Sequence, residues 1–227
     1  MHFAILAIIL IVVIYLPQFL AKSTFKKYNK HSEHFPGTGG ELARHLLDKF
    51  ELQSVGVEVT ETGDHYDPES RMVRLSAENF NQKSLTAVAI ASHEVGHAIQ
   101  HAQNHPMLML RAKLVRIAFA AEKAGSLAMI AIPFVTVITR APSAALLLFV
   151  IAIGSMLIST IVHLVTLPVE WDASFGKALP LLKSGEYLNE SELINAEKIL
   201  KAAAFTYVAG SLASLLNLWR WIAILRR

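Results

Sequence analysis

Apolar residues in this chain are concentrated in four segments, which cover residues 3–20, 124–139, 144–165 and 202–218. A helix needs about 20 apolar residues to cross the hydrocarbon core of a bilayer. The first and third segments meet this length, whereas the other two are shorter or flanked by polar residues. The pattern predicts about four transmembrane helices. The first is expected to be an uncleaved anchor, because it lacks a basic start and an Ala-x-Ala-type cleavage site.

The polar residues after the first apolar segment carry helical patterns. Residues 32–40 are rich in Gly, Ser and Pro and are expected to form a linker. Three leucines at helical spacing then predict a helix over residues 40–50. Farther along, Ser84 is a suitable N-cap for a helix of apolar and small residues, and Pro106 is placed to open the next helix.

Two short segments alternate between apolar and polar residues, which is the period of a half-buried strand. They are residues 55–60 and 71–76. We expect these strands to form a small β-hairpin with a long tip that spans residues 61–70. Asp67 stands before Pro68 in that tip and is expected to accept hydrogen bonds from backbone N–H groups of a turn.

Composition supports membrane association. The chain is 53% hydrophobic and 17% charged, with a mean hydropathy of +0.42, which is too apolar for an ordinary soluble domain of 227 residues. The net charge of +3 does not indicate nucleic-acid binding, because the basic residues cluster beside the apolar segments, where anionic lipid accounts for them. The chain has no cysteine, which excludes disulfides and thiolate metal ligands.

The basic residues also predict an orientation, because they flank the apolar segments on the side that the positive-inside rule assigns to the cytoplasm. They are Lys22, Lys26, Lys27, Lys30, Arg111, Lys113, Arg116, Lys177, Lys183, Lys198 and Lys201. We therefore predict an anchor over residues 1–21, a cytoplasmic domain over 22–116, two membrane helices over 117–165, a cytoplasmic segment over 166–202, and a C-terminal transmembrane or interfacial helix over 203–227.

The helix that Ser84 caps contains the sequence His93-Glu94-Val95-Gly96-His97. Residues four apart lie on one helix face, so both imidazoles can bind one zinc ion. Glu94 lies beside them, where it can act as general base on a zinc-bound water. The longer metzincin pattern does not continue, because Gln100 and Gln103 replace its glycine and third histidine.

A catalytic zinc needs a third protein ligand, and several residues are candidates. His101 lies about 6 Å farther along the helix than His97, so a surface or interfacial role is expected. His163 lies deep in the third apolar segment. Glu170 follows that segment on the predicted side of the two histidines and is the best candidate, although an acid near a helix start after Pro168 is the structural alternative. The remaining acids of this part are expected to lie on a solvated helix face, and they are Glu186, Glu190, Glu192 and Glu197.

The chain resembles the YugP-like family of membrane-bound neutral zinc metallopeptidases. The matching stretches are residues 22–28, 64–68, 74–76, 91–101 and 167–174. The resemblance implies zinc binding by His93, His97 and Glu170, with Glu94 catalytic.

A looser similarity to the HtpX and CAAX-type membrane proteases concerns the residues after the third ligand. Those proteins have an aspartate four residues after the glutamate, and it supports a zinc histidine. Ser174 stands at that position here and carries no charge. Asp172 is the available substitute, although it is expected to point to another part of the helix.

These observations predict a mainly α membrane protein with a zincin-like α+β domain. Its expected activity is that of a gluzincin-like, zinc-dependent endopeptidase acting on a peptide or membrane protein, in a bacterial inner membrane. His65 and Tyr66 are candidate donors to the oxyanion. The alternatives are a membrane scaffold with a structural zinc site or a degenerate protease, and the intact Glu94 argues against the second. No role is assigned to His105, and no oligomeric state is predicted.

Overall fold

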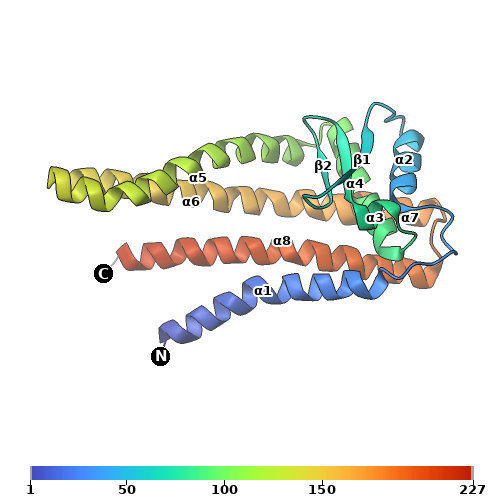
Figure 1. The fold of residues 1–227 in the computed structure, drawn as a ribbon, viewed down its shortest axis with the longest axis horizontal. Helices are drawn as coiled ribbons and strands as arrows, with labels where there is room; N and C mark the ends of the chain where they lie inside the picture. Colours follow the sequence, from blue (N-terminus) through green and yellow to red (C-terminus); the bar gives the residue numbers. More distant parts are fainter. Residues whose placement is uncertain (1, 226–227) are drawn as a thin grey trace. The chain divides into compact units, whose positions relative to one another are not determined.

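The computed structural model describes residues 2–225, which form two compact units (Figure 1). The α unit comprises the described parts of Met1–Ile14, Met109–Leu167 and Tyr207–Arg227. The α+β unit comprises Tyr15–Leu108 and Pro168–Thr206. The long helices each contribute residues to both units. They are α1 (His2–Tyr28), α5 (Pro106–Thr139), α6 (Pro142–Trp171) and α8 (Glu190–Leu225).

Three helical stretches among the described residues are long and apolar enough to cross a membrane. They are Pro106–Thr139, Pro142–Ser184 and Glu190–Leu216. Side chains on them are exposed as lipid-facing side chains would be, and Phe119 and Ile138 of α5 are 75% and 79% exposed. The anchor predicted over residues 1–21 falls mostly within α1, which is not one of these three stretches. A fourth membrane span therefore stays a prediction. The C-terminal helix predicted over residues 203–227 falls within α8, except that Arg226 and Arg227 lie outside the described residues.

The sheet of the α+β unit differs from the predicted hairpin. Its strands are β1 (Gly56–Thr60), β2 (His65–Asp67) and β3 (Met72–Ser76), in the order β1-β3-β2. β1 and β3 pair in parallel, so the hairpin prediction for them is wrong. The expected tip contains a third strand, and it is β2 that pairs antiparallel with β3. Because β2 occupies one edge of β3, β1 pairs at the other edge, and the chain crosses over between them.

Asp67 closes the β2–β3 turn as predicted. Its Oδ1 accepts hydrogen bonds from the backbone N–H groups of Glu69, at 2.9 Å, and Ser70, at 3.4 Å. Its Oδ2 accepts from the Arg74 guanidinium at 2.7 Å. The hydrogen bond from the Ser70 hydroxyl, followed by those from Arg74 and the two N–H groups, holds the pKa of Asp67 well below its usual range.

Three helices pack with the sheet, and their starts are capped by side chains. They are α2 (Gly39–Lys49), α3 (Ala77–Asn81) and α4 (Leu85–Ala102). Thr38 forms a capping box with Glu41 at the start of α2, and Ser84 Oγ accepts from the Ala87 N–H at the start of α4. Every residue of α4 from Leu85 to Gln100 is buried. Polar side chains on this helix therefore need partners inside the protein.

Candidate metal centre

Two separate parts of the α+β unit bring three metal-ligating side chains together. His93 and His97 lie one turn apart on α4, and Glu170 lies near the end of α6. One ligand atom from each lies within 4.8 Å of the other two. The three residues are 6%, 6% and 2% exposed. The described residues thus include the predicted ligand set as one buried cluster.

The spacing of these atoms fits a zinc ion. Glu170 Oε2 lies 3.2 Å from His93 Nε2 and 3.4 Å from His97 Nε2. Tetrahedral zinc with bonds of about 2.0–2.2 Å holds its ligand atoms roughly 3.3–3.6 Å apart. Two imidazoles and one carboxylate form a catalytic donor set that leaves a fourth position open.

Gln100 fixes the orientation of His97. Its Nε2 donates to the backbone oxygen of Val169 at 2.9 Å and to Asp172 Oδ2 at 2.8 Å. Both of these partners are acceptors, so the amide oxygen of Gln100 faces His97 Nδ1, at 2.9 Å. His97 therefore carries its proton on Nδ1 and presents the lone pair of Nε2 to the metal position.

Ser174 supports the other histidine, from a π-helix. This π-helix, η1 (Asp172–Ala178), follows α6 directly and is continued by α7 (Leu179–Ser184). Ser174 is fully buried, and its Oγ lies 3.1 Å from His93 Nδ1. The serine therefore makes the contact that the looser family similarity assigns to an aspartate, without the charge.

Gly96 permits the close approach of η1 to α4. A Cβ atom at this position would lie 2.8 Å from the Ala173 carbonyl oxygen and 3.3 Å from Lys177 Cβ. Any larger residue would push η1 away from α4. The glycine within the His-Glu-Val-Gly-His sequence thus lets the segment that carries Ser174 reach His93.

Glu94 lies beside the ligands and is 5% exposed. Burial raises its pKa to about 7, with further raising effects from the charges of Glu170 and Asp64. The charge of His93 and a hydrogen bond from the Tyr66 backbone oppose this increase in pKa. A carboxylate with a pKa near neutrality is suited to accept and return a proton at physiological pH.

The other histidines named from the sequence lie outside the three-residue cluster. His101 Nδ1 lies 2.8 Å from the Tyr66 hydroxyl, and His65 Nδ1 lies 2.7 Å from the Gly63 oxygen within its own loop. His105 Nε2 lies 3.9 Å from Asp172 Oδ2. His163 belongs to the α unit, where its backbone oxygen accepts from Ser211 Oγ at 3.1 Å. The oxyanion roles suggested for His65 and Tyr66 stay predictions.

Gln100 is the residue of the site that sequence reasoning missed. It entered the sequence argument only as a departure from the metzincin pattern. Its position three residues after His97 places both side chains on one face of α4, and this spacing was the available signal. Its contact with Asp172 had no signal in the sequence, because it depends on how η1 packs.

Comparisons with known proteins agree with the geometry. Residues 3–226 match the family described as "Putative neutral zinc metallopeptidase". The chain is also 37% identical over 211 residues to "Putative membrane protease YugP" of Bacillus subtilis (strain 168), an alignment that covers 91% of this chain and 89% of that protein. No solved structure matches, so the zincin-like character of the α+β unit stays a prediction. The family match spans nearly the whole sequence, and the chain belongs to this neutral zinc metallopeptidase family.

Proposed function

We propose that this protein is a membrane-bound zinc-dependent endopeptidase. The observation that carries the proposal is the buried convergence of two imidazole nitrogens and one carboxylate oxygen, with Glu94 beside them. His93, His97 and Glu170 would hold the zinc ion. When bound, zinc supplies a Lewis acid that polarises the scissile carbonyl and makes water acidic enough to attack it.

The remaining chemistry belongs to Glu94. It takes a proton from the attacking water and delivers it to the nitrogen of the leaving amine, so that it ends the cycle ionised as it began. The raised pKa of about 7 supports this role, because the group can then both accept and release the proton. Gln100 and Ser174 hold the two histidines in position for metal binding.

A structural zinc site is the opposing function, and it needs four protein ligands. The metal-ligating cluster found among residues 2–225 has three members. The fourth ligand would have to be His163 or His101. His101 lies against the Tyr66 hydroxyl instead, and His163 is not a member of the cluster. The three-ligand arrangement therefore supports the catalytic function.

The deciding experiment is the Glu94→Gln substitution in the full-length protein purified in detergent. We expect zinc content equal to that of the wild type, because none of the three ligands is changed. Cleavage of an unfolded model substrate such as casein should fall to background. Unchanged cleavage in the variant, or loss of its zinc, would contradict the roles given to the four residues.

The proposal also covers where the enzyme works. The three apolar helices support insertion in a membrane, and the relative from Bacillus subtilis is named as a membrane protease. We assign the α+β unit to the cytoplasmic side of a bacterial inner membrane, since the basic residues near the end of α1 and near the start of α5 favour that side. Protease accessibility of a tag inserted in the linker of residues 32–38, in inverted membrane vesicles, tests this orientation.

A further inference from the structure

A cavity of about 480 Å³, lined mainly by polar and charged residues, lies in the α+β unit beside α1 and α4. Thr86 Oγ1 donates to the Phe25 oxygen at 2.9 Å, and Ser84 Oγ donates to Asn29 Oδ1 at 2.6 Å. The first bond joins α1 to α4, and the second joins the residue after α1 to the N-cap of α4. The volume of the cavity is within the usual range for a cavity that binds a small ligand or a side chain.

The cavity borders the face of α4 that carries Glu94. Thr86 and Ile90 of α4 line it. Thr86, Ile90 and Glu94 are spaced four residues apart along this helix. The three side chains therefore follow one face of α4. Asp64, which directly precedes β2, also lines the cavity. A substrate that follows this face of α4 from Glu94 would therefore reach the cavity.

The acidic groups of the cavity already have hydrogen-bond donors. Asp64 accepts three hydrogen bonds, from the backbone N–H of Ser76 at 2.7 Å, the Ser76 hydroxyl at 3.1 Å and Asn79 Nδ2 at 2.8 Å. Glu78 accepts from Asn29 Nδ2. Both carboxylates are therefore engaged with the cavity wall.

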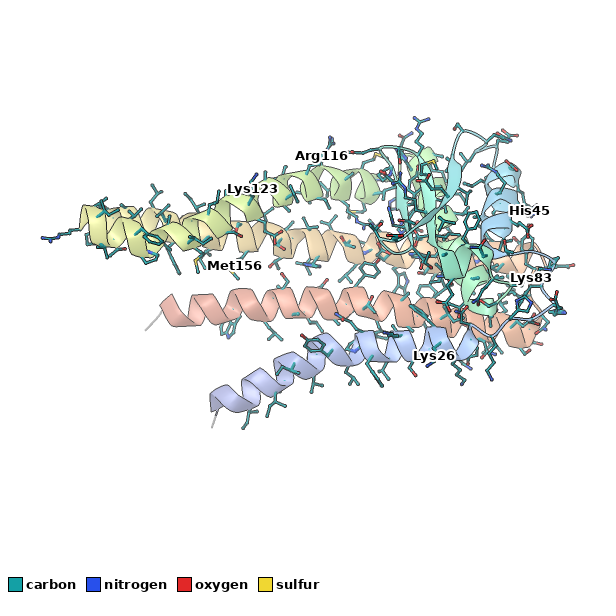
Figure 2. All side chains as sticks on the ribbon, viewed as in Figure 1. Lys26, His45, Lys83, Arg116, Lys123 and Met156 are labelled. Atoms are coloured by element: carbon teal, nitrogen blue, oxygen red, sulfur yellow. The ribbon has the colours of Figure 1, made fainter. Side chains whose placement is uncertain are left out.

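The two basic groups of the cavity differ from the acidic ones. Lys22 and Lys26 lie one turn apart on α1 and both line the cavity; Figure 2 labels Lys26. In the part of the chain that the structure describes, neither lysine forms an ion pair. Their ammonium groups remain available to a negatively charged ligand.

We infer that this cavity is a specificity subsite, in which Lys22 and Lys26 bind a carboxylate of the peptide substrate. The inference rests on the proposed function. The carboxylate belongs either to an Asp or Glu side chain near the scissile bond or to the C-terminus of the peptide. A peptide is favoured over a lipid headgroup because Thr86 and Ile90, which line the cavity, lie on the α4 face that leads to Glu94.

The test measures binding separately from turnover. The zinc-loaded Glu94→Gln protein, in nanodiscs of zwitterionic lipid, is titrated with three fluorescein-labelled peptides of one sequence. The first is neutral with a C-terminal amide, the second has one Gln replaced by Glu, and the third has a free C-terminal carboxylate. We expect one acidic peptide to bind about five- to tenfold more tightly than the neutral one, and the tighter of the two identifies the source of the carboxylate.

The matched variants are Lys22→Gln with Lys26→Gln, and Lys27→Gln with Lys30→Gln as the control. Both pairs remove two charges from the same region of the chain, but Lys27 and Lys30 do not line the cavity. Only the first pair should abolish the preference for the acidic peptide. In the enzyme with Glu94 intact, the same pair should lower kcat/KM for that peptide and leave the neutral peptide unchanged.

Three results would overturn the inference. The first is equal binding of all three peptides. The second is an equal loss of the preference for the acidic peptide in both lysine-pair variants. The third is that Lys22→Gln with Lys26→Gln changes only the binding to vesicles of anionic lipid. Failure of the proposed function is distinguished from these, because it appears as unchanged casein cleavage in Glu94→Gln.

Discussion

The Gln100→Leu substitution tests whether His97 must be held by its neighbour to bind zinc. Leucine has nearly the volume of glutamine, so the change removes hydrogen bonds without opening a large cavity. The bonds lost are those to His97 Nδ1, the Val169 oxygen and Asp172. His97 then loses the acceptor that fixes its proton on Nδ1.

The expected magnitude follows from these contacts. Removing a partner that orients a metal-bound histidine costs about 10- to 100-fold in metal affinity, or about 1.4–2.8 kcal/mol. Folding is also affected, because the hydrogen bond from Gln100 to the Val169 carbonyl is lost, at a cost of about 0.5–1.5 kcal/mol. Asp172 contributes less to this cost, since 31% of its side chain is exposed and water can replace the lost donor.

The assay is competition for zinc between the full-length protein and a chelator of known affinity at pH 7. Gln103→Leu is the matched control, because Gln103 caps the end of the same helix and its exposed side chain accepts a hydrogen bond from Lys177 at 3.0 Å. The control should bind zinc as the wild type does. Folded Gln100→Leu protein with a zinc affinity within twofold of the wild type would refute the orienting role of Gln100.

Three further predictions concern the neighbours of the metal ligands. Ser174→Ala should weaken zinc binding by less than Gln100→Leu does in the same competition assay, because a rotating hydroxyl does not select one proton position on His93; a larger loss would contradict this. Gly96→Ala should lower the unfolding free energy by about 1–3 kcal/mol, because the added Cβ would meet the Ala173 oxygen. Thermal unfolding measures this loss, and Gly154→Ala is the control, because no atom lies within 4 Å of the Cβ added there. In zinc-free protein, the pKa of Glu94 is raised from 4.5 to about 7. The folded protein therefore keeps this proton to a higher pH than the unfolded chain does, and the unfolding free energy should fall by about 3 kcal/mol as pH rises through that window. The wild-type unfolding free energy minus that of Glu94→Gln should show this decline, and a flat difference would exclude it.

Local features of the fold could be predicted because each depends on residues close together in the sequence. The N-cap at Ser84, the helix over α2 and the start of α5 at Pro106 are confirmed. The pairing of His93 with His97 also follows from helix geometry alone. Glu170 was nominated from hydropathy and charge, and the structure brings its carboxylate to both imidazoles.

The sheet order could not be predicted from the alternating pattern. β2 has three residues, which is too short for a period of two to be visible. Once β2 is missed, the two longer strands have only the hairpin as a plausible pairing. The parallel register of β1 and β3 depends on β2 taking the other edge of β3, which is information from pairing rather than from either strand.

The support of the two histidines depends on η1, and nothing in the sequence indicates a π-helix at this position. In a continuous α-helix, Asp172 and Ser174 are displaced from each other and cannot both face α4 (roughly 100° per residue). A π-helix has wider turns, and in η1 Asp172 reaches Gln100 while Ser174 reaches His93. Gly176 accommodates this turn, because a Cβ there would lie 2.1 Å from Asp172 Oδ1. A larger residue at position 176 would therefore displace the Asp172 carboxylate and weaken one of the two hydrogen bonds that orient the Gln100 amide.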